Sequence, residues 1–150
     1  MSKIEKVLAT GKTHTTASST GNTGRGHNGS LDIHLSSPGS TKPVHVFAAT
    51  QPHPTAEQLF AGAWSACYTA AVGLVAQDMN VVLPAGLAVE IEVDLGQTGP
   101  AYFLQARLTV RLPGVAHDVA TTLAHTADQI CPYSKATRGN IDVALNVITA

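Results

Sequence analysis

Alternating apolar and polar residues, or runs of β-branched ones, mark six stretches of the chain, and both patterns are typical of strands. The alternation is clearest where charged residues interleave with valine, isoleucine and leucine. Such a pattern predicts a strand that turns its apolar face to the core and its charged face to solvent. The six predicted strands are residues 6–16, 31–36, 44–47, 89–95, 104–112 and 141–147. Between them, residues 17–29 and 96–100 are rich in glycine and small polar residues and are predicted as loops.

Two further stretches repeat apolar residues at helical spacing. The first follows Thr55, a suitable N-cap, with Glu57 in the first turn where the helix dipole favours a negative charge, and it ends near residue 80. It is apolar on almost every face, which predicts a central, buried helix. The second spans residues 119–131, and Pro132 is expected to end it.

The resulting order, β-β-β-α-β-β-α-β, predicts one α+β domain over residues 1–150 with a largely antiparallel sheet. It excludes a doubly wound fold, and the chain has no dinucleotide or P-loop motif. On the polar faces of two neighbouring strands, acidic residues at 90, 92 and 94 can oppose Arg107 and Arg111. Such cross-strand ion pairs would help to set the register.

Composition narrows the function classes. Of the 150 residues 44% are apolar and 13% charged, and the net charge is −1, so neither nucleic acid nor an anionic membrane is an expected partner. The low charge favours a surface covered by a second copy of the chain. We find no run of the roughly 18 apolar residues that a membrane span needs and expect the cytosol. The seven histidines form no His-Glu-x-x-His pattern, so a metal site is not expected, although a mixed site of histidine and cysteine ligands is conceivable.

The chemistry is expected at the only two cysteines, Cys67 within the first helix and Cys131 at the end of the second. A structural disulfide is improbable in the cytosol. One interpretation is a redox pair, in which the first thiol is oxidised to sulfenic acid and the second condenses with it. The other is that each cysteine is a small buried apolar residue.

Glu57 precedes Cys67 by ten residues, which is about 15 Å along a straight helix. Either the helix is broken between them, or the carboxylate near each thiol comes from another subunit. A carboxylate alone raises the pKa of a thiol, so it fits beside a reactive cysteine only when a cation balances it. Arginine suits that role because it also binds a carboxylate through two hydrogen bonds.

Three motifs together resemble the organic hydroperoxide resistance (Ohr) proteins of the wider Ohr/OsmC family. They are Glu-Gln-Leu-Phe-Ala at 57–61, Ser-Ala-Cys at 65–67, and Cys-Pro-Tyr-Ser-Lys-Ala-Thr-Arg-Gly-Asn-Ile-Asp-Val at 131–143. The last is long and quite specific to the Ohr branch. With shorter matches at residues 5–8, 83–85 and 112–114, the resemblance covers essentially the whole chain.

The resemblance implies a peroxidase for organic hydroperoxides, with Cys67 as the peroxidatic thiol, Cys131 as the resolving thiol and Glu57 as the active-site glutamate. It implies an intertwined homodimer, with antiparallel sheets around two central helices and active sites at the subunit interface. The reductant it implies is a dithiol, typically the lipoyl group of a lipoylated protein. It implies no metal and no bound cofactor.

The chain departs from the family at the loop that carries the catalytic arginine. Alignment without gaps places that arginine on Ser19, whereas the only arginine of this loop is Arg25. Thr55-Ala56 also replaces the usual Asn-Pro, after a longer loop rich in His and Pro. Either Arg25 takes the catalytic place, or the chain is a small-molecule-binding or thiol-sensing relative with weak peroxidase activity. The second interpretation would use an apolar pocket around Trp64, Tyr68 and Tyr133.

Overall fold

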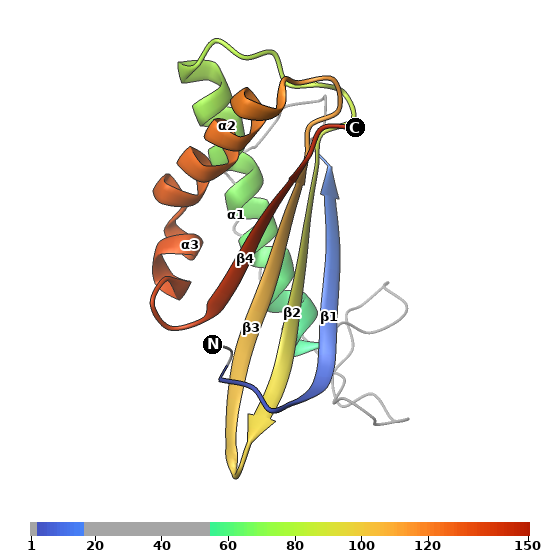
Figure 1. Cartoon of the computed structure of the whole chain (residues 1–150), viewed down its shortest axis with the longest axis vertical. Helices are drawn as coiled ribbons and strands as arrows, with labels where there is room; N and C mark the ends of the chain where they lie inside the picture. Colours follow the sequence, from blue (N-terminus) through green and yellow to red (C-terminus); the bar gives the residue numbers. More distant parts are fainter. Residues whose placement is uncertain (1–2, 17–54) are drawn as a thin grey trace, which may run out of the picture.

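The computed structural model describes residues 3–16 and 55–150. The predicted strands at 31–36 and 44–47, and the candidate residue Arg25, lie outside this part of the chain. Within it the elements are β1 (Lys6–Thr16), α1 (Ala56–Asp78), β2 (Ala88–Thr98), β3 (Ala101–Arg111), α2 (His117–Ile130), α3 (Pro132–Thr137) and β4 (Asp142–Ile148). Figure 1 shows the long strands as one layer and the helices as a second layer beside it.

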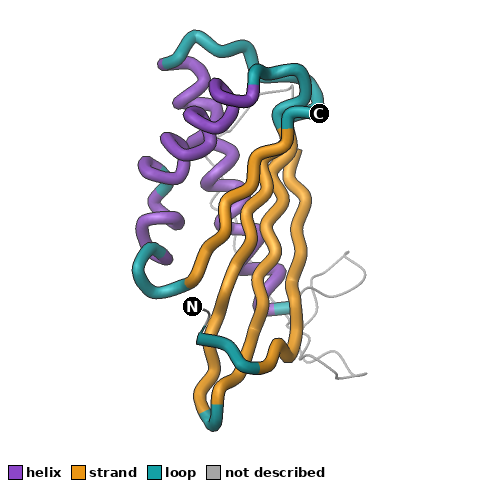
Figure 2. The backbone as a smooth tube through the Cα atoms, viewed as in Figure 1, coloured by secondary structure: helices purple, strands orange, loops and turns teal. Residues whose placement is uncertain are grey.

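The described strands form one sheet in the order β1-β2-β3-β4. β1 pairs with β2 and β2 with β3 in antiparallel fashion, whereas β4 pairs with β3 in parallel. The α+β prediction is confirmed, but the sheet is mixed rather than antiparallel throughout. The parallel pair arises because α2 and α3 carry the chain back to the end of the sheet from which β3 started, and such a crossover usually contains a helix (Figure 2).

The β2–β3 connection is tighter than the loop predicted at residues 96–100. β2 continues to Thr98 and β3 begins at Ala101, so only Gly99 and Pro100 form the turn. Gly99 has a φ of 54°, a left-handed conformation that glycine adopts without a steric penalty. Because the turn contains only these two residues, β2 and β3 stay paired up to Thr98 and Ala101, as in other two-residue hairpins.

The helices cover one face of the sheet. α1 packs on β1 and β2, and α2 lies beside α1 and reaches β4. The core forms between these layers. Its largest fully buried side chains are Trp64, Tyr68, Ile91, Leu108, Leu112 and Leu123.

The other face of the sheet carries the predicted ion pairs. Arg107 donates to both carboxylate oxygens of Asp94, at 2.6 and 3.0 Å, and through Nε to Glu92 at 2.9 Å. Arg111 pairs with Glu90 at 3.2 Å. These contacts join β3 to β2 across their antiparallel register. The predicted cross-strand ion pairs are therefore confirmed.

α1 is long and apolar enough to cross a membrane by length and mean hydropathy, although Ser65 and Thr69 interrupt its apolar residues and it holds no unbroken run of the length sought in the sequence. Of its most apolar 18-residue window, 44% is buried inside the fold. A central helix of a globular domain meets the same criterion, and α1 packs against strands and helices along its length. Its composition therefore decides nothing about a membrane.

Candidate functional site

The first turn of α1 is fixed by a reciprocal pair of hydrogen bonds. The Gln58 amide donates to Thr55 Oγ1 at 3.2 Å, and the Thr55 amide donates to Gln58 Oε1 at 3.0 Å. This capping box satisfies backbone groups that a helix start leaves unpaired. The predicted N-cap at Thr55 is confirmed, and α1 then runs unbroken from Ala56 to Asp78.

An unbroken helix removes one of the two explanations for Glu57. The spacing of ten residues along α1 separates Glu57 from Cys67 by about 15 Å, so the carboxylate does not reach the thiol of its own chain. Glu57 is nevertheless only 6% exposed, and its Oε2 has no hydrogen-bond partner within residues 3–16 and 55–150. A buried carboxylate oxygen is unfavourable without a partner. Its partner must be sought outside the described residues or in another subunit.

Cys131 lies at a sharp change of direction between two helices. It ends α2 and precedes α3, with extended backbone angles (φ −62°, ψ 120°), and Pro132 occupies the first position of α3. Pro132 thus ends α2, as predicted, and also begins α3, which was not predicted. Proline at a first helical position is common, because its missing N–H has no partner there in any case.

This turn brings Cys131 against Cys67. Both thiols are reduced, and Cys131 Sγ donates to Cys67 Sγ across 3.5 Å. A disulfide has a sulfur–sulfur distance of about 2.05 Å, so a shift of about 1.5 Å would close the bond. Cys131 is fully buried, whereas Cys67 is partly exposed. A reagent from solvent therefore meets Cys67 first.

Two hydrogen bonds hold α1 against the other helices on either side of Cys67. Trp64 Nε1 donates to Ser134 Oγ in α3 at 3.1 Å. The Tyr68 hydroxyl donates to the carbonyl of Ala124 in α2 at 2.6 Å. All four residues are buried, so the contact between the two sulfur atoms lies in a rigid part of the structure.

The described surroundings raise the pKa of the Cys67 thiol. Burial is the largest cause, the Cys131 thiol adds to it, and the backbone N–H of Tyr133 acts in the opposite direction by hydrogen-bonding to the sulfur. Burial disfavours the charged thiolate, while a donor aimed at the sulfur favours it. Among residues 3–16 and 55–150 no basic side chain hydrogen-bonds to Cys67. The predicted cation Arg25, like Ser19, lies outside these residues.

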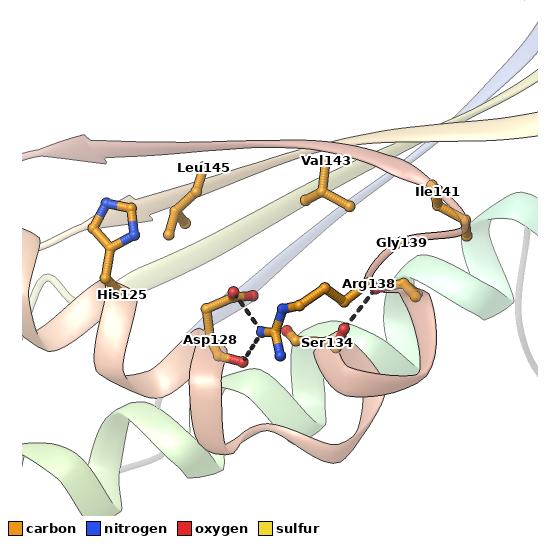
Figure 3. Close-up of a pocket in the computed structure, with 9 residues that line it drawn as sticks. His125, Asp128, Ser134, Arg138, Gly139, Ile141, Val143 and Leu145 are labelled. Atoms are coloured by element: carbon orange, nitrogen blue, oxygen red, sulfur yellow. Dashed lines mark hydrogen bonds and ion pairs between the residues drawn. The ribbon is translucent and has the colours of Figure 1, made fainter. Parts of the chain in front are cut away.

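A separate cavity of about 340 Å³ lies between α2, α3 and β4 (Figure 3). It combines polar and apolar walls, formed by His125, Asp128, Ser134, Thr137, Arg138, Gly139, Ile141, Val143 and Leu145. Arg138 Nη2 donates to the carboxylate and to the backbone carbonyl of Asp128, at 2.8 and 2.9 Å. Neither cysteine lines this cavity, and Ser134, which accepts the hydrogen bond from Trp64 Nε1, forms part of its wall.

Within the described residues, two of the three side chains around which an apolar pocket was proposed are core residues, and the third, Tyr133, is 46% exposed. Trp64 is 1% exposed and Tyr68 is fully buried, and both belong to the core. Burial also raises the pKa of the Tyr68 hydroxyl well above its usual range. The cavity near Arg138 was missed from sequence because its walls come from three elements whose spacing only the fold reveals.

The fold and the site together define a class: an α+β domain in which a cysteine on a central helix contacts a cysteine at a helix–helix turn. Comparison with known proteins identifies the family. The family model for OsmC-like proteins matches residues 49–146, which contain both cysteines and Glu57. The chain belongs to the OsmC-like family.

Relatives and solved structures agree with this assignment. The organic hydroperoxide resistance protein of Xanthomonas axonopodis pv. citri is 36% identical over 149 residues, covering 98% of this chain and 99% of the relative. OhrA of Bacillus subtilis is 34% identical over 117 residues, covering 78% of this chain and 80% of the relative.

Among solved structures, an organic hydroperoxide resistance protein from Elizabethkingia anophelis superposes with a TM-score of 0.64 at 28% identity, covering 98% of this chain and all of that chain. OhrB of Bacillus subtilis superposes with a TM-score of 0.62 at 25% identity, covering 93% and 97% of the two chains. The resemblance found in the sequence is thereby confirmed at the level of the family and its fold.

Proposed function

We propose that this chain is a cysteine-based peroxidase that reduces organic hydroperoxides to alcohols. The observation that carries the proposal is the 3.5 Å contact between the sulfur atoms of Cys67 and Cys131, with one thiol accessible and the other buried. The names of the relatives, organic hydroperoxide resistance proteins, support the substrate class.

In the first step the Cys67 thiolate attacks the distal oxygen of ROOH. A sulfur–oxygen bond forms and the oxygen–oxygen bond breaks, so sulfur is oxidised to the sulfenic acid and the peroxide is reduced. The leaving alkoxide takes up the proton that the thiol had released and departs as ROH. Donors aimed at the sulfur favour this step because they stabilise the thiolate.

In the second step the Cys131 sulfur attacks the Cys67 sulfenic acid. The disulfide forms and water leaves, carrying the sulfenic oxygen and the proton of the second thiol. An external dithiol then reduces the disulfide by two exchange reactions and becomes a disulfide itself. We propose a lipoyl group as that dithiol, as the family resemblance implies, and place the cycle in the cytoplasm, where thiols are kept reduced.

Glu57 and Arg25 complete the proposed site. The unpartnered Oε2 of the buried Glu57 fits a guanidinium that holds the carboxylate on one side and the Cys67 thiolate on the other. Arg25 is the arginine of the loop that carries this residue in the family. In this arrangement Arg25 offsets the effect of burial on the Cys67 pKa, and Glu57 orients the guanidinium.

We further propose that the protein is a homodimer whose sites lie between subunits. α1 exposes a stripe of apolar residues, Ala63, Ala66, Ala70 and Leu74, and Leu74 is 59% exposed. Cys67 is on the same side of α1, at helical spacing from Ala63, Ala70 and Leu74. A second copy packed on this stripe would lie beside Cys67, and its Glu57 would be the carboxylate that the helix length denies to the same chain.

The test is the reaction of the reduced protein with cumene hydroperoxide, followed by stopped-flow fluorescence and mass spectrometry. We expect Cys67→Ser to abolish peroxide consumption. Cys131→Ser should consume about one peroxide per chain quickly and a second more slowly, as the second peroxide oxidises the sulfenic acid to sulfinic acid, because no thiol resolves the sulfenic acid. Unchanged steady-state turnover in Cys67→Ser would overturn the proposal.

One observation favours a second candidate function, a thiol sensor or small-molecule-binding protein with weak peroxidase activity. The described residues raise the pKa of Cys67, which lowers the thiolate fraction at neutral pH. If Arg25 does not reach the Cys67 sulfur, the pKa of this thiol remains raised. The two functions separate in one measurement, because a sensor of this kind would react with hydroperoxides no faster than a free thiol.

A further inference from the structure

Gly11 in β1 has no space for a side chain. A Cβ built on Gly11 would lie 2.4 Å from the Gln58 nitrogen, 2.5 Å from the Glu57 carbonyl carbon and 2.7 Å from Glu57 Cβ. The first two are backbone atoms of the first turn of α1, so no side-chain rotation relieves the contact. Gly11 is buried and pairs with Val93 in the core-facing register of the sheet. Only glycine permits β1 and the start of α1 to approach this closely.

The constraint is local to this point. Further along the same β1–α1 contact, a Cβ built on Gly62 would meet only Thr13 Cγ2, at 3.9 Å, which is ordinary van der Waals contact. One turn beyond, Thr15 Oγ1 and Ser65 Oγ are hydrogen-bonded at 2.7 Å. The strand and the helix therefore pack normally above the first turn, and at the first turn they touch backbone to backbone.

The residue fixed by this contact is Glu57. Its backbone is held between Gly11 on one side and the capping box of Thr55 and Gln58 on the other. Its carboxylate is 6% exposed, and no hydrogen bond within residues 3–16 and 55–150 positions Oε2. In this part of the chain, the location of that oxygen depends on where the backbone of the first turn lies.

We propose that Gly11 is a positioning residue for the peroxidase site, acting through Glu57; the inference rests on the proposed function. A methyl group at position 11 would push the first turn of α1 from β1 by about 1 Å to reach normal contact distances, and a displacement of this size at an active site can lower a rate by up to about a hundredfold. The carboxylate would move with its backbone. Its alignment with the cation that it orients would be lost while Cys67 and Cys131 stay in place.

The test is a double-mutant cycle on the second-order rate constant for oxidation of Cys67 by cumene hydroperoxide. We expect Gly11→Ala to lower this constant by about tenfold. In the Glu57→Gln background, the same substitution should change it by less than about twofold, because the group it displaces is already disabled. The matched control is Gly62→Ala, which adds the same methyl group to the same β1–α1 contact and should leave the rate constant unchanged.

The outcomes separate the two proposals. Equal losses from Gly11→Ala with and without Glu57, or no loss at all, would overturn the positioning role and leave the peroxidase assignment intact. A wild-type protein that reacts no faster than a free thiol would overturn the peroxidase assignment and the positioning role together. If Gly11→Ala does not fold, Glu57→Asp moves the carboxylate by about one methylene with Gly11 retained. A wild-type rate in that variant would contradict the proposal, and a loss close to that of Glu57→Gln would support it.

Discussion

The indole N–H of Trp64 donates to Ser134 Oγ at 3.1 Å, and this bond joins the helix that carries Cys67 to the short helix that follows Cys131. Trp64 lies one turn before Cys67, and Ser134 lies three residues after Cys131. Both partners are buried, so the bond is protected from competing water. It holds the two sulfur atoms in contact before any oxidant arrives.

Ser134→Ala is therefore expected to slow disulfide formation more than the first oxidation. The substitution removes the acceptor of the buried indole N–H, and the free energy of unfolding should fall by about 1–3 kcal/mol. Stopped-flow tryptophan fluorescence, together with trapping of the sulfenic acid by dimedone, separates the two steps. We expect resolution to slow several-fold and the rate constant for Cys67 oxidation to change little.

Tyr133→Phe is the control for that variant, since it alters a half-exposed neighbour and keeps the backbone N–H that faces Cys67. It should leave both steps unchanged. Equal slowing of both steps in Ser134→Ala would mean that the Trp64–Ser134 bond stabilises the whole site rather than the sulfur contact.

Arg25→Ala is expected to raise the pKa of the Cys67 thiol above that of a free cysteine, about 8.5. Burial already raises this pKa in the described structure, and the variant would remove the proposed counterbalance. Thiolate absorbance at 240 nm, measured against pH in the Cys131→Ser background, gives the pKa directly. At pH values below this pKa, the rate of Cys67 oxidation should rise about tenfold per pH unit, because only the thiolate reacts.

The matched control is Arg111→Ala, which removes the same charge from the outer face of the sheet, where Arg111 pairs with Glu90. It should not change the Cys67 titration. The same Cys67 pKa in Arg25→Ala and in the parent protein would show that Arg25 is not the cation of the site.

Mixed dimers test whether Glu57 and Cys67 act across a subunit interface. Glu57→Gln and Cys67→Ser homodimers should each be nearly inactive. In a mixed dimer, the intact Glu57 of one chain would face the intact Cys67 of the other and restore one site. Co-expression with two affinity tags, followed by tandem purification, yields the mixed species. We expect about half the wild-type activity per dimer, since one of two symmetry-related sites is complete. No activity above that of the two homodimers would show that Glu57 of one chain does not act on Cys67 of the other.

Much of this arrangement could be predicted from the sequence. Local signals were sufficient where local physics decides: the cap at Thr55, the alternation of β2 and β3, and the opposition of Arg107 to Glu92 and Asp94. The motifs around Cys67 and Cys131 identified the family. Sequence could suggest the contact between the two sulfur atoms but could not establish it, because the contact depends on how α2 and α3 meet α1.

Other features had no sequence signal of their own. Pro132 was predicted only to end a helix, since its role as the first residue of a six-residue helix depends on the packing of Ser134 and Thr137 in the core. The role of Gly11 was not foreseen, because a glycine within a strand reveals a close approach only when the opposing backbone is known. The parallel placement of β4 likewise follows from the crossover through two helices rather than from its own pattern.

Asp94→Asn tests the largest electrostatic contribution on the outer face of the sheet. The Arg107 guanidinium, with help from Gln105 and Thr10, holds the pKa of the Asp94 carboxyl well below its usual range. A carboxyl whose pKa is lowered by folding stabilises the protein above its unfolded pKa of about 4, and this contribution is lost as pH falls below that value. Because Arg107 is 38% exposed, solvent weakens the pair, and we expect Asp94→Asn to lower the free energy of unfolding by about 1–2 kcal/mol at pH 7.

The pH dependence distinguishes this charge effect from a loss of packing. Urea unfolding at pH 7 and at pH 3 should show the difference between wild type and Asp94→Asn shrinking at the lower pH, since protonation of the unfolded chain removes the advantage of the wild-type carboxylate. Asp142→Asn is the control, because Asp142 is exposed and forms no ion pair within the described residues. Its effect should be small at both pH values. A difference for Asp94→Asn that is the same at pH 7 and pH 3 would show that the Asp94 side chain stabilises the sheet by its shape and hydrogen bonds rather than by its charge.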